Sequence, residues 1–545
     1  MFDIINNRIK DLTEFQKLDF LKRHRILTHY PYELPLQTEL LKEQMIFSQK
    51  KQNIVFLQEI KNLATLAEQN KIDLIFFKGV SLAKEVYVDF DKRLTGDIDV
   101  LIMPQNLARF IHILKAHGGY KDFTFDIEEE SNKHIKGRGS HFPPLDKEVF
   151  FEGIKYIFHL EVHVRMTTID LRDHNCTSNI DEFKLVEHII SRARWFKLNI
   201  EEKKSIDIKV MDIYDSLIIL VLHMVKHLLW DLTKTIFHGR SFFFNIQLIL
   251  DLINFWTKYK NNINYEMLYS RIEEYDVLNA FLIGRRIVDN LYQEFLGNMF
   301  RDKCLITTEN HSITSGLLHN LNYLNADDII FLSSDKLFDK IINSKKFADD
   351  CYAKVNKQPI EQTVISASPY GSCYNSRGEK ISSDIQMHFE ISCDSNCLHF
   401  CIDVKNKNYI FENTCLNDMC LCDTIQLNFL SNTPNETGRY DRCFRVCFED
   451  APSAYLKDCS EREWINISKQ ICNISVNTKN NGYSVMFSIP WRVMGIKYVE
   501  NGTLLLMLSL KNYNIKSNET TLLTHNIANR CFGYFSIYEY ICIKM

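Results

Sequence analysis

Apolar residues recur at helical spacing over the first 70 residues of the chain. Leu57, Ile60 and Leu63 step along one face of a helix, with polar residues between them. Residues 1–70 are therefore predicted to form an N-terminal helical segment.

Two strand–helix units are predicted to follow this segment. The apolar run Ile72–Phe77 has the length of a strand and ends at Lys78-Gly79, after which helical spacing resumes. Residues Asp97–Met103 alternate again, and a second helical run begins after Pro104 and ends at Gly118-Gly119. This order predicts a core that mixes strands with helices.

A longer strand with one polar face is predicted over Tyr156–Met166. Apolar and polar residues alternate along it, so that one face is apolar and the other carries Glu161, His163 and Arg165. Polar groups gathered on one face of a strand indicate a functional site.

The rest of the chain changes character twice. Residues 180–350 contain long amphipathic runs with little alternation, which predicts helices. After Lys354–Pro359, short alternating segments are separated by polar turns, namely Asp384–Ile391, Leu398–Val404, Thr424–Phe429 and Tyr483–Ile489. The expected fold class is α+β multidomain, with an α/β core at 71–180, a helical domain at 181–352 and an antiparallel β-sandwich at 353–545.

Composition agrees with a globular chain of several domains. The 545 residues exceed what one hydrophobic core supports, and 46% of them are hydrophobic and 25% charged. The formal net charge of -4 argues against a strongly basic surface of the kind that binds nucleic acid or anionic membranes. Nucleic acid is therefore not the expected partner.

A cytoplasmic location is expected from the absence of targeting signals. The chain opens with Met1-Phe2-Asp3 and shows no charged region followed by an apolar run. The apolar stretch Ser216–Trp230 includes His223, Lys226 and His227, so it falls short of the about 18–20 uninterrupted apolar residues of a membrane span. No membrane partner is expected.

The chain has 16 cysteines, and most of them follow residue 370. Cys393, Cys397 and Cys401 are spaced by four and Cys420 and Cys422 by two, without the paired C-x-x-C spacing of zinc sites. We expect reduced thiols that fill the core of strands.

Two carboxylates carry the chemical prediction. Asp97 and Asp99 are two apart on a predicted strand, so both side chains emerge on the same face. Two Mg²⁺ ions about 3.5–4 Å apart suit phosphoryl transfer, and a third carboxylate normally completes the cage. Glu161, on the polar face of the later strand, is predicted to be the third ligand.

A bound phosphate group needs hydrogen-bond donors. The segment Lys78-Gly79-Val80-Ser81 offers them, because a helix is predicted to begin there. Free N–H groups and the helix dipole favour an anion there, and Gly79 permits a close approach of the backbone. Arg93 is predicted to reach a phosphate in fork geometry, and Lys78 as a point charge. Lys78, Gly79, Ser81 and Arg93 are the predicted nucleotide-binding residues.

These residues resemble the DNA polymerase β-like nucleotidyltransferase superfamily. The segments FFKGVSL, KRLTGDIDVLI and HLEVHVRM resemble the bacterial branch of uncharacterised nucleotidyltransferases over about residues 50–300. The resemblance implies a short mixed sheet with helices, magnesium held by Asp97, Asp99 and Glu161, and a nucleoside triphosphate near Gly79 and Ser81. The chain departs from the superfamily's more usual Gly-Gly or Gly-Ser turn at Lys78–Ser81, and from the branch's tryptophan at Val164.

Several histidines are open to two interpretations. The resemblance would place His141 near the site, but it is equally read as an ordinary loop histidine; His163 and Arg165 are possible contacts to phosphate or acceptor. His223 and His227 have the i, i+4 spacing of metal ligands, yet no H-E-x-x-H glutamate accompanies them, which favours helix packing. Asp251 is expected to pair with Arg240 or a helix histidine in a structural role.

The last third resembles family 9 carbohydrate-binding-module-like sandwiches. Asp423 and the run Ile489-Pro490-Trp491 carry this resemblance. Sugar binding exploits aromatic faces, but Trp491 is expected to pack in the core, and Trp464 is the other tryptophan of the region. The sandwich is thus expected to bind a glycan, a protein or nothing.

The preferred interpretation is a magnesium-dependent nucleotidyltransferase that moves AMP from ATP to a small-molecule, glycan or peptide acceptor. The alternative is an inert nucleotidyltransferase scaffold that binds a carbohydrate or a protein partner. Nucleic-acid polymerisation ranks last, because it would require a basic channel with stacking aromatic residues.

Overall fold

The structure is a computed structural model in which two compact units are distinguished. The first comprises Met1–His227 with Phe243–Ser312, and the second Leu228–Phe242 with Ile313–Met545. The structure describes residues 1–121, 126–135, 141–166, 171, 182–201, 204–238, 242–292, 295–296, 324–334, 336–337, 340, 372–374, 380–381, 386–405, 415–416, 419–420, 424–431, 441–447, 453–457, 465–466, 472–479, 481–494, 503–514, 519–524 and 541–544. The predicted domain limits at residues 70, 180 and 352 stay predictions.

The first unit is built on a six-stranded mixed sheet in the order β3-β4-β2-β1-β6-β5. The β1–β2, β3–β4 and β5–β6 pairs are antiparallel, whereas β2–β4 and β1–β6 are parallel. Its strands are β1 (Ile75–Phe77), β2 (Asp97–Leu101), β3 (Leu145–Phe151), β4 (Ile154–His163), β5 (Arg194–Glu201) and β6 (Lys204–Val210). A mixed sheet with helices is what the sequence predicted.

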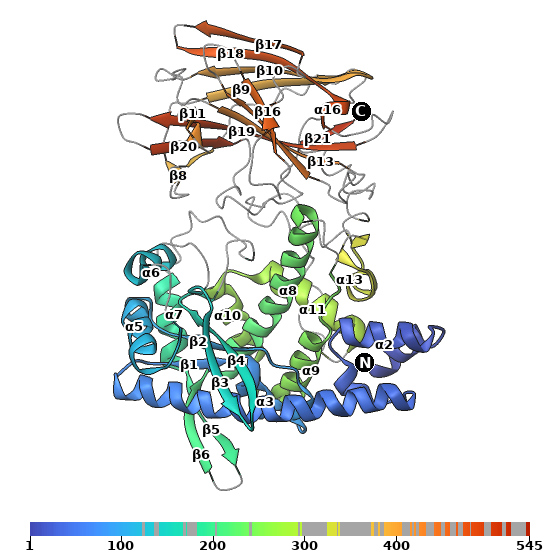
Figure 1. Ribbon diagram of the computed structural model, residues 1–545, viewed down its shortest axis with the longest axis vertical. Coiled ribbons are helices and arrows are strands. Elements are labelled where there is room, and N and C mark those ends of the chain that lie inside the picture. The colour runs from blue at the N-terminus through green and yellow to red at the C-terminus, as the bar shows by residue number, and fades with distance from the viewer. Residues whose placement is uncertain are drawn as a thin grey trace. The chain divides into compact units, whose positions relative to one another are not determined.

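Helices pack around this sheet (Figure 1). They include helices in residues 1–70, after Lys78-Gly79 and after Pro104, where the sequence predicted them. They are α1 (Phe2–Ile9), α2 (Glu14–Arg23), α3 (Leu36–Gln69), α4 (Gly79–Val86), α5 (Leu107–His117), α6 (Ile127–Ile135), α7 (Glu182–Arg192), α8 (Ile213–His238), α9 (Gln247–Tyr259), α10 (Tyr265–Tyr275) and α11 (Leu278–Leu291). Short 3₁₀ turns are η1 (Leu27–His29), η2 (Phe90–Lys92), η3 (Pro104–Asn106) and η5 (Lys260–Asn262). Helix α5 ends at Gly118, as predicted.

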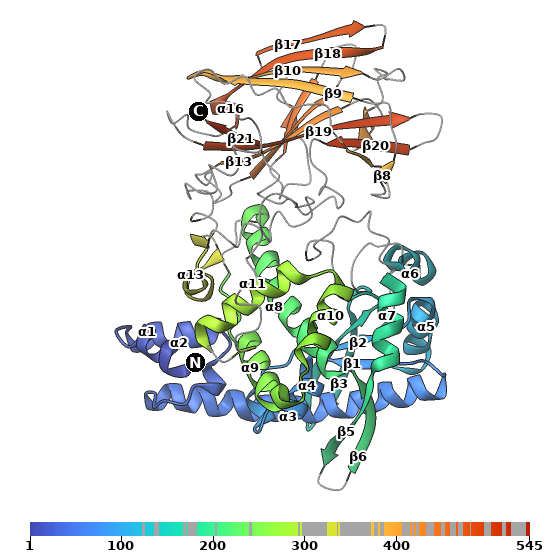
Figure 2. The ribbon, with the colours of Figure 1, turned by 180° about the vertical axis from the view of Figure 1, so that it is seen from behind.

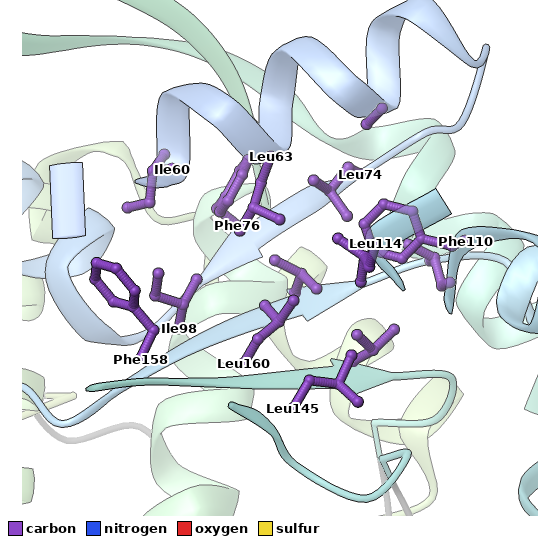
Figure 3. Packing of buried hydrophobic residues seen from close by; sticks show 14 of the residues in the cluster. Ile60, Leu63, Leu74, Phe76, Ile98, Phe110, Leu114, Leu145, Phe158 and Leu160 are labelled. Carbon is purple, nitrogen blue, oxygen red and sulfur yellow. The ribbon is translucent and has the colours of Figure 1, made fainter. Parts of the chain in front are cut away.

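The core of the first unit lies between the long helix α3 and the sheet. Ile60 and Leu63 of α3 are buried against Phe76 of β1 and Ile98 of β2 (Figure 3). The helical spacing read from the sequence therefore marks the buried face of α3. Burying such side chains stabilises the unit by about 1.5–3 kcal/mol each.

One hairpin was missed by the sequence analysis, which expected helices after residue 180. Strands β5 and β6 extend the sheet beyond β1 and form a projecting ribbon (Figure 2). Ile206, Ile208 and Val210 do alternate with polar residues, but the run is short and lies between two long helices. β6 pairs with β5 over most of its length and with β1 at its end, and these backbone hydrogen bonds make it a strand of the sheet.

Antiparallel sheets form most of the described part of the second unit, which also includes the end of α8 from Leu228. One is four-stranded, in the order β17-β18-β10-β9, and the other is a larger sheet in the order β16-β15-β14-β13-β19-β20-β7-β8, with β21 beside β19. Their bounds are β7 (Ser372–Tyr374), β8 (Lys380–Ile381), β9 (Gln386–Cys393), β10 (Cys397–Lys405), β13 (Thr424–Ser431), β14 (Asp441–Cys447), β15 (Ser453–Lys457), β16 (Ile465–Asn466), β17 (Cys472–Lys479), β18 (Gly482–Pro490), β19 (Thr503–Asn514), β20 (Glu519–Thr524) and β21 (Ile541–Lys544). A two-stranded ribbon of β11 (Cys415–Leu416) and β12 (Met419–Cys420), and the helices α13 (Ala326–Phe331) and α16 (Trp491–Met494), complete the unit.

Two predictions for this unit can be scored on its described residues. Trp491 is buried and donates its indole N–H to the Asp394 carbonyl at 2.7 Å, so its expected core position is confirmed. Cys397 and Cys401 are free thiols that lie half-buried on the opposite face of β10 from its buried residues, so core filling is wrong for these two. Asp423, Trp464 and Lys354–Pro359 lie outside the described residues.

Helix α8 is long and apolar. Its segment Ile213–Leu232 has a length and composition that would allow it to cross a membrane, and 61% of its most apolar window is buried inside the protein. A buried core helix has the same properties.

Candidate active site

The parallel pairing of β2 with β4 brings the predicted carboxylates together. In this register Asp99 faces Glu161 and Asp97 faces His159. Residues paired across neighbouring strands project to the same side of the sheet, so Asp97, Asp99 and Glu161 lie on one face. The sequence predicted this grouping from the spacing of the polar residues on each strand.

Asp99 is buried and accepts hydrogen bonds from two side chains. Its Oδ1 accepts from the Lys78 ammonium at 2.8 Å and from His163 Nε2 at 3.0 Å. Burial acts to raise the pKa of Asp99, but Lys78 and His163 outweigh it and hold that pKa well below the usual range. Asp99 is therefore a carboxylate at neutral pH.

Glu161 is half-buried beside two imidazole rings. His163 Nε2 lies 3.4 Å from Glu161 Oε2, and His141 Nε2 lies 4.0 Å from the same oxygen. Burial acts to raise the pKa of Glu161, but the hydrogen bond from His163 offsets it, and the pKa is lowered. The structure thus brings His141 and His163 to the carboxylates, with their ring centres 5.2 Å apart.

Asp97 behaves differently from its neighbours. Burial and the adjacent charge of Asp99 raise the pKa of Asp97 to about 6, although Lys78 partly opposes this. A carboxyl group that is buried beside other carboxylates is stabilised in its charged form by a cation. Asp97 therefore indicates a place where positive charge is favoured.

The residues fit a divalent cation. Ligand atoms of Asp99, Glu161 and His163 all lie within 4.8 Å of one another, and Asp97 projects from the same strand face as Asp99. Carboxylate oxygens are the hard ligands that Mg²⁺ prefers. A bound cation would also stabilise the charged form of Asp97, whose pKa is raised. His163 was predicted only as a phosphate or acceptor contact.

The loop before α4 has a strained backbone. Lys78 has φ 58° and ψ -157°, and Gly79 has φ 50°. A Cβ on Gly79 would lie 3.1 Å from the Asp97 carbonyl oxygen, so the glycine lets the loop approach β2. Ser81 donates its hydroxyl hydrogen to the Lys78 carbonyl at 2.8 Å, which fixes the first turn of α4.

Arg93 is fully engaged by a residue far away in the sequence. Its Nε and Nη2 donate to the two carboxylate oxygens of Asp251 at 2.7 and 2.8 Å, and its Nη1 donates to Thr95 at 3.1 Å. Asp251 also accepts from the Tyr87 hydroxyl at 2.6 Å. The predicted phosphate-binding role of Arg93 stays a prediction, while its observed contacts hold η2 and the start of β2 against α9.

Asp251 was expected to pair with Arg240 or a helix histidine, and its partner Arg93 is a correction. The two residues are 158 positions apart, so no local signal in the sequence could have paired them. Arg240 lies outside the described residues. Arg165, the remaining predicted contact, lies beyond the end of β4 with its guanidinium 6.0 Å from the centre of the Phe183 ring.

Comparison with known proteins places the chain in a family. A family model described as "uncharacterised nucleotidyltransferase" matches residues 14–293, and the chain belongs to this family. It is accordingly a nucleotidyl-transferring enzyme. The matched segment contains every residue of the candidate site. No curated protein matches the chain.

Solved structures similar to this chain include a family 9 carbohydrate-binding module from Caldicellulosiruptor kristjanssonii. Its complex with glucose is 12% identical, with 33% of this chain and 83% of that chain covered and a TM-score of 0.25. Its complex with cellotriose is also 12% identical, with 36% and 85% covered and a TM-score of 0.23.

Proposed function

We propose that the enzyme transfers a nucleotidyl group, AMP from ATP, to a small-molecule, glycan or peptide acceptor in the cytoplasm. The observation that carries the proposal is the register of β2 with β4, which sets Asp99 beside Glu161 on one sheet face with Asp97. Three carboxylates beside a Lys-Gly loop form a site for a metal-bound triphosphate.

Asp97, Asp99 and Glu161 would hold two Mg²⁺ ions. When bound, these ions neutralise phosphate charge and stabilise the attacking and leaving oxygens. His163 orients Asp99 and Glu161 through its Nε2, at 3.0 and 3.4 Å. The Lys78 ammonium lies 2.8 Å from Asp99. In the complex with nucleotide it would turn from Asp99 toward a phosphate oxygen.

The reaction replaces one phosphoanhydride bond. An acceptor oxygen bonds to the α-phosphorus, the bond to the bridging oxygen of the β-phosphate breaks, and pyrophosphate leaves while the acceptor proton passes to solvent. The residues of this chain supply position and charge: Gly79 and Ser81 place the first turn of α4 against β2, and free N–H groups there would bind the anion.

A second candidate function is an inert scaffold that binds a carbohydrate or a partner. The observation that favours it is the Lys78–Asp99 ion pair, because a lysine already compensates a predicted metal ligand. The two candidates differ in what Asp97 and Asp99 are needed for.

Transfer of label from α-³²P-ATP to small-molecule and peptide fractions tests the proposal. Wild-type protein with Mg²⁺ should label one fraction, and Asp97→Ala with Asp99→Ala should abolish the labelling. Asp73→Ala is the matched control, because Asp73 is a half-exposed carboxylate near β1 that pairs with Lys209. No labelling by folded wild-type protein with any fraction would favour the scaffold.

A further inference from the structure

Helix α8 passes beside the loop Lys78–Ser81, which is called the phosphate loop. A small cavity is lined together by Lys78 and Ser81 from the loop and by Ser216, Ile219 and Leu220 from α8. One face of the helix therefore looks onto the residues predicted to bind phosphate.

Two histidines continue this face over the next two turns of α8. His223 follows Ile219 by four positions and Leu220 by three, and His227 follows His223 by four, which places them on the same side of the helix. Their Nε2 atoms are 2.9 Å apart and their rings are perpendicular, with centres separated by 4.4 Å. One Nε2–H donates to the lone pair of the other ring.

Cationic side chains lie near this pair, and two of them are already ion-paired, Lys78 with Asp99 and Arg93 with Asp251. Burial, with the charges of Lys78, His227, Lys226 and Arg93, lowers the pKa of His223 well below its usual value. The charge of Lys226 also acts on His141 beside the carboxylates. Lysine and arginine side chains near a neutral His223 disfavour a metal cation and favour an anion.

We propose that the basic face of α8, formed by His223, Lys226 and His227, binds the β- and γ-phosphates of the nucleotide donor. An incoming phosphate would accept the N–H that now joins the two rings, and the second ring would donate to it in the Nε2–H tautomer. Lys78 bonds to Asp99 at 2.8 Å and lines a cavity together with α8, so it connects the carboxylates to this helix. The metal-binding carboxylates and the basic face thus serve opposite ends of the triphosphate.

The chemistry favours the pyrophosphate part of the donor over the nucleoside. A base requires apolar or aromatic surfaces to stack on, whereas this face offers N–H donors and an ammonium group. Pyrophosphate also gains charge as the bond to the α-phosphorus breaks, so donors placed here act in the transition state. The inference rests on the proposed function, because it names the part of that substrate which α8 binds.

Isothermal titration with inorganic pyrophosphate and Mg²⁺ tests the inference separately from transfer. Wild-type protein should bind pyrophosphate, and His223→Leu with His227→Leu should weaken the binding about tenfold or more, since the N–H donors to the anion are lost. AMP affinity should not change. The control is His112→Leu with His117→Leu, two exposed histidines of α5.

Lys226→Met gives a second variant if the double histidine variant fails to fold, and it should weaken pyrophosphate binding in the same direction. Absence of pyrophosphate binding by wild-type protein overturns the inference, as does equal affinity in the α8 variants or an equal loss of AMP affinity. Pyrophosphate binding that depends on α8 in a protein that labels no acceptor would retain the inference while the proposed function fails.

Discussion

The β2–β4 pair of the first unit and the β10–β18 pair of the second treat polar residues in opposite ways. On β2 and β4, Asp99 and Glu161 are neighbours of like charge. On β10 and β18, His399 faces Ser488 and bonds to it at 2.8 Å, while its other ring nitrogen bonds to Asp394 at 3.1 Å. The polar groups of the second pair are hydrogen-bonded, whereas the first pair places carboxylates beside Asp97 at an electrostatic cost that falls on Asp97.

Such a cost is retained where it serves a site. Perturbed carboxyl groups in one place are typical of catalytic centres, and Asp97 has its pKa raised to about 6 by burial and by Asp99. Lys78, whose backbone is strained at φ 58°, and Gly79 lie beside the same strand. The contrast supports the assignment of the candidate site to the first unit.

The largest effect is predicted for a substitution that breaks the buried Arg93–Asp251 ion pair beside β2. Asp251→Ala should lower the free energy of unfolding by about 3–5 kcal/mol, because it leaves the buried Arg93 without its partner. Asp403→Ala is the matched change in the second unit. Its pair with Lys479 is largely exposed, so the loss should stay below about 1 kcal/mol. Urea unfolding of both variants measures the difference, and equal losses would contradict it.

Acid should destabilise the first unit through His24. Burial lowers the pKa of His24 to about 4, and its Nδ1–H donates to the Phe244 carbonyl at 2.7 Å. The unfolded chain takes up a proton near the ordinary pKa of about 6.5 and the folded chain does not, so stability present above that pH is lost as the pH falls toward 4. Lowering the pH from 7 to 5 should cost about 2 kcal/mol through this residue.

His24→Asn should remove that part of the acid dependence, since an amide does not titrate in this range. Exposed His112 is the matched control, and His112→Asn should retain the wild-type dependence. Thermal unfolding at pH 7 and pH 5 provides the comparison. An unchanged pH dependence in His24→Asn would refute the assignment.

Gly79→Ala should cost about 1–2 kcal/mol of stability and weaken nucleotide binding. The substitution forces a side chain into φ 50° and places its Cβ 3.1 Å from the Asp97 carbonyl oxygen. Gly96→Ala is the control, because a Cβ there has nothing within 4 Å. Titration with ATP should separate the two variants; equal affinities would show that the close approach does not matter.

The smallest effect is expected in the second unit. His399→Ala removes two hydrogen bonds at a half-exposed site and should cost about 1 kcal/mol. Nucleotide binding should remain at the wild-type level. Loss of nucleotide affinity in this variant would break the division of roles between the units.

The sequence predicted what depends on local spacing. The i, i+2 pattern placed Asp97 with Asp99, and alternation placed Glu161 on the polar face of its strand, both as the structure has them. The helix end at Gly118 and the antiparallel strands around Leu398–Val404 and Tyr483–Ile489 follow the same kind of local signal.

Long-range pairing lay beyond such signals. The partner of Arg93 is set by the packing of α9, and the β5–β6 hairpin becomes part of the sheet only by pairing with β1. The cysteine prediction was wrong for Cys397 and Cys401 because a small apolar side chain is tolerated on either face of a strand. The surroundings of His223 likewise depend on where α8 passes the phosphate loop.

Isothermal titration with ATP, GTP, CTP and UTP in Mg²⁺ tests the central claim most directly. The wild-type protein is expected to bind at least one triphosphate in a Mg²⁺-dependent manner, and Asp97→Asn with Asp99→Asn should weaken that binding at least about 100-fold. Folded wild-type protein that binds no triphosphate, or a variant that binds as well as the wild type, would contradict the account.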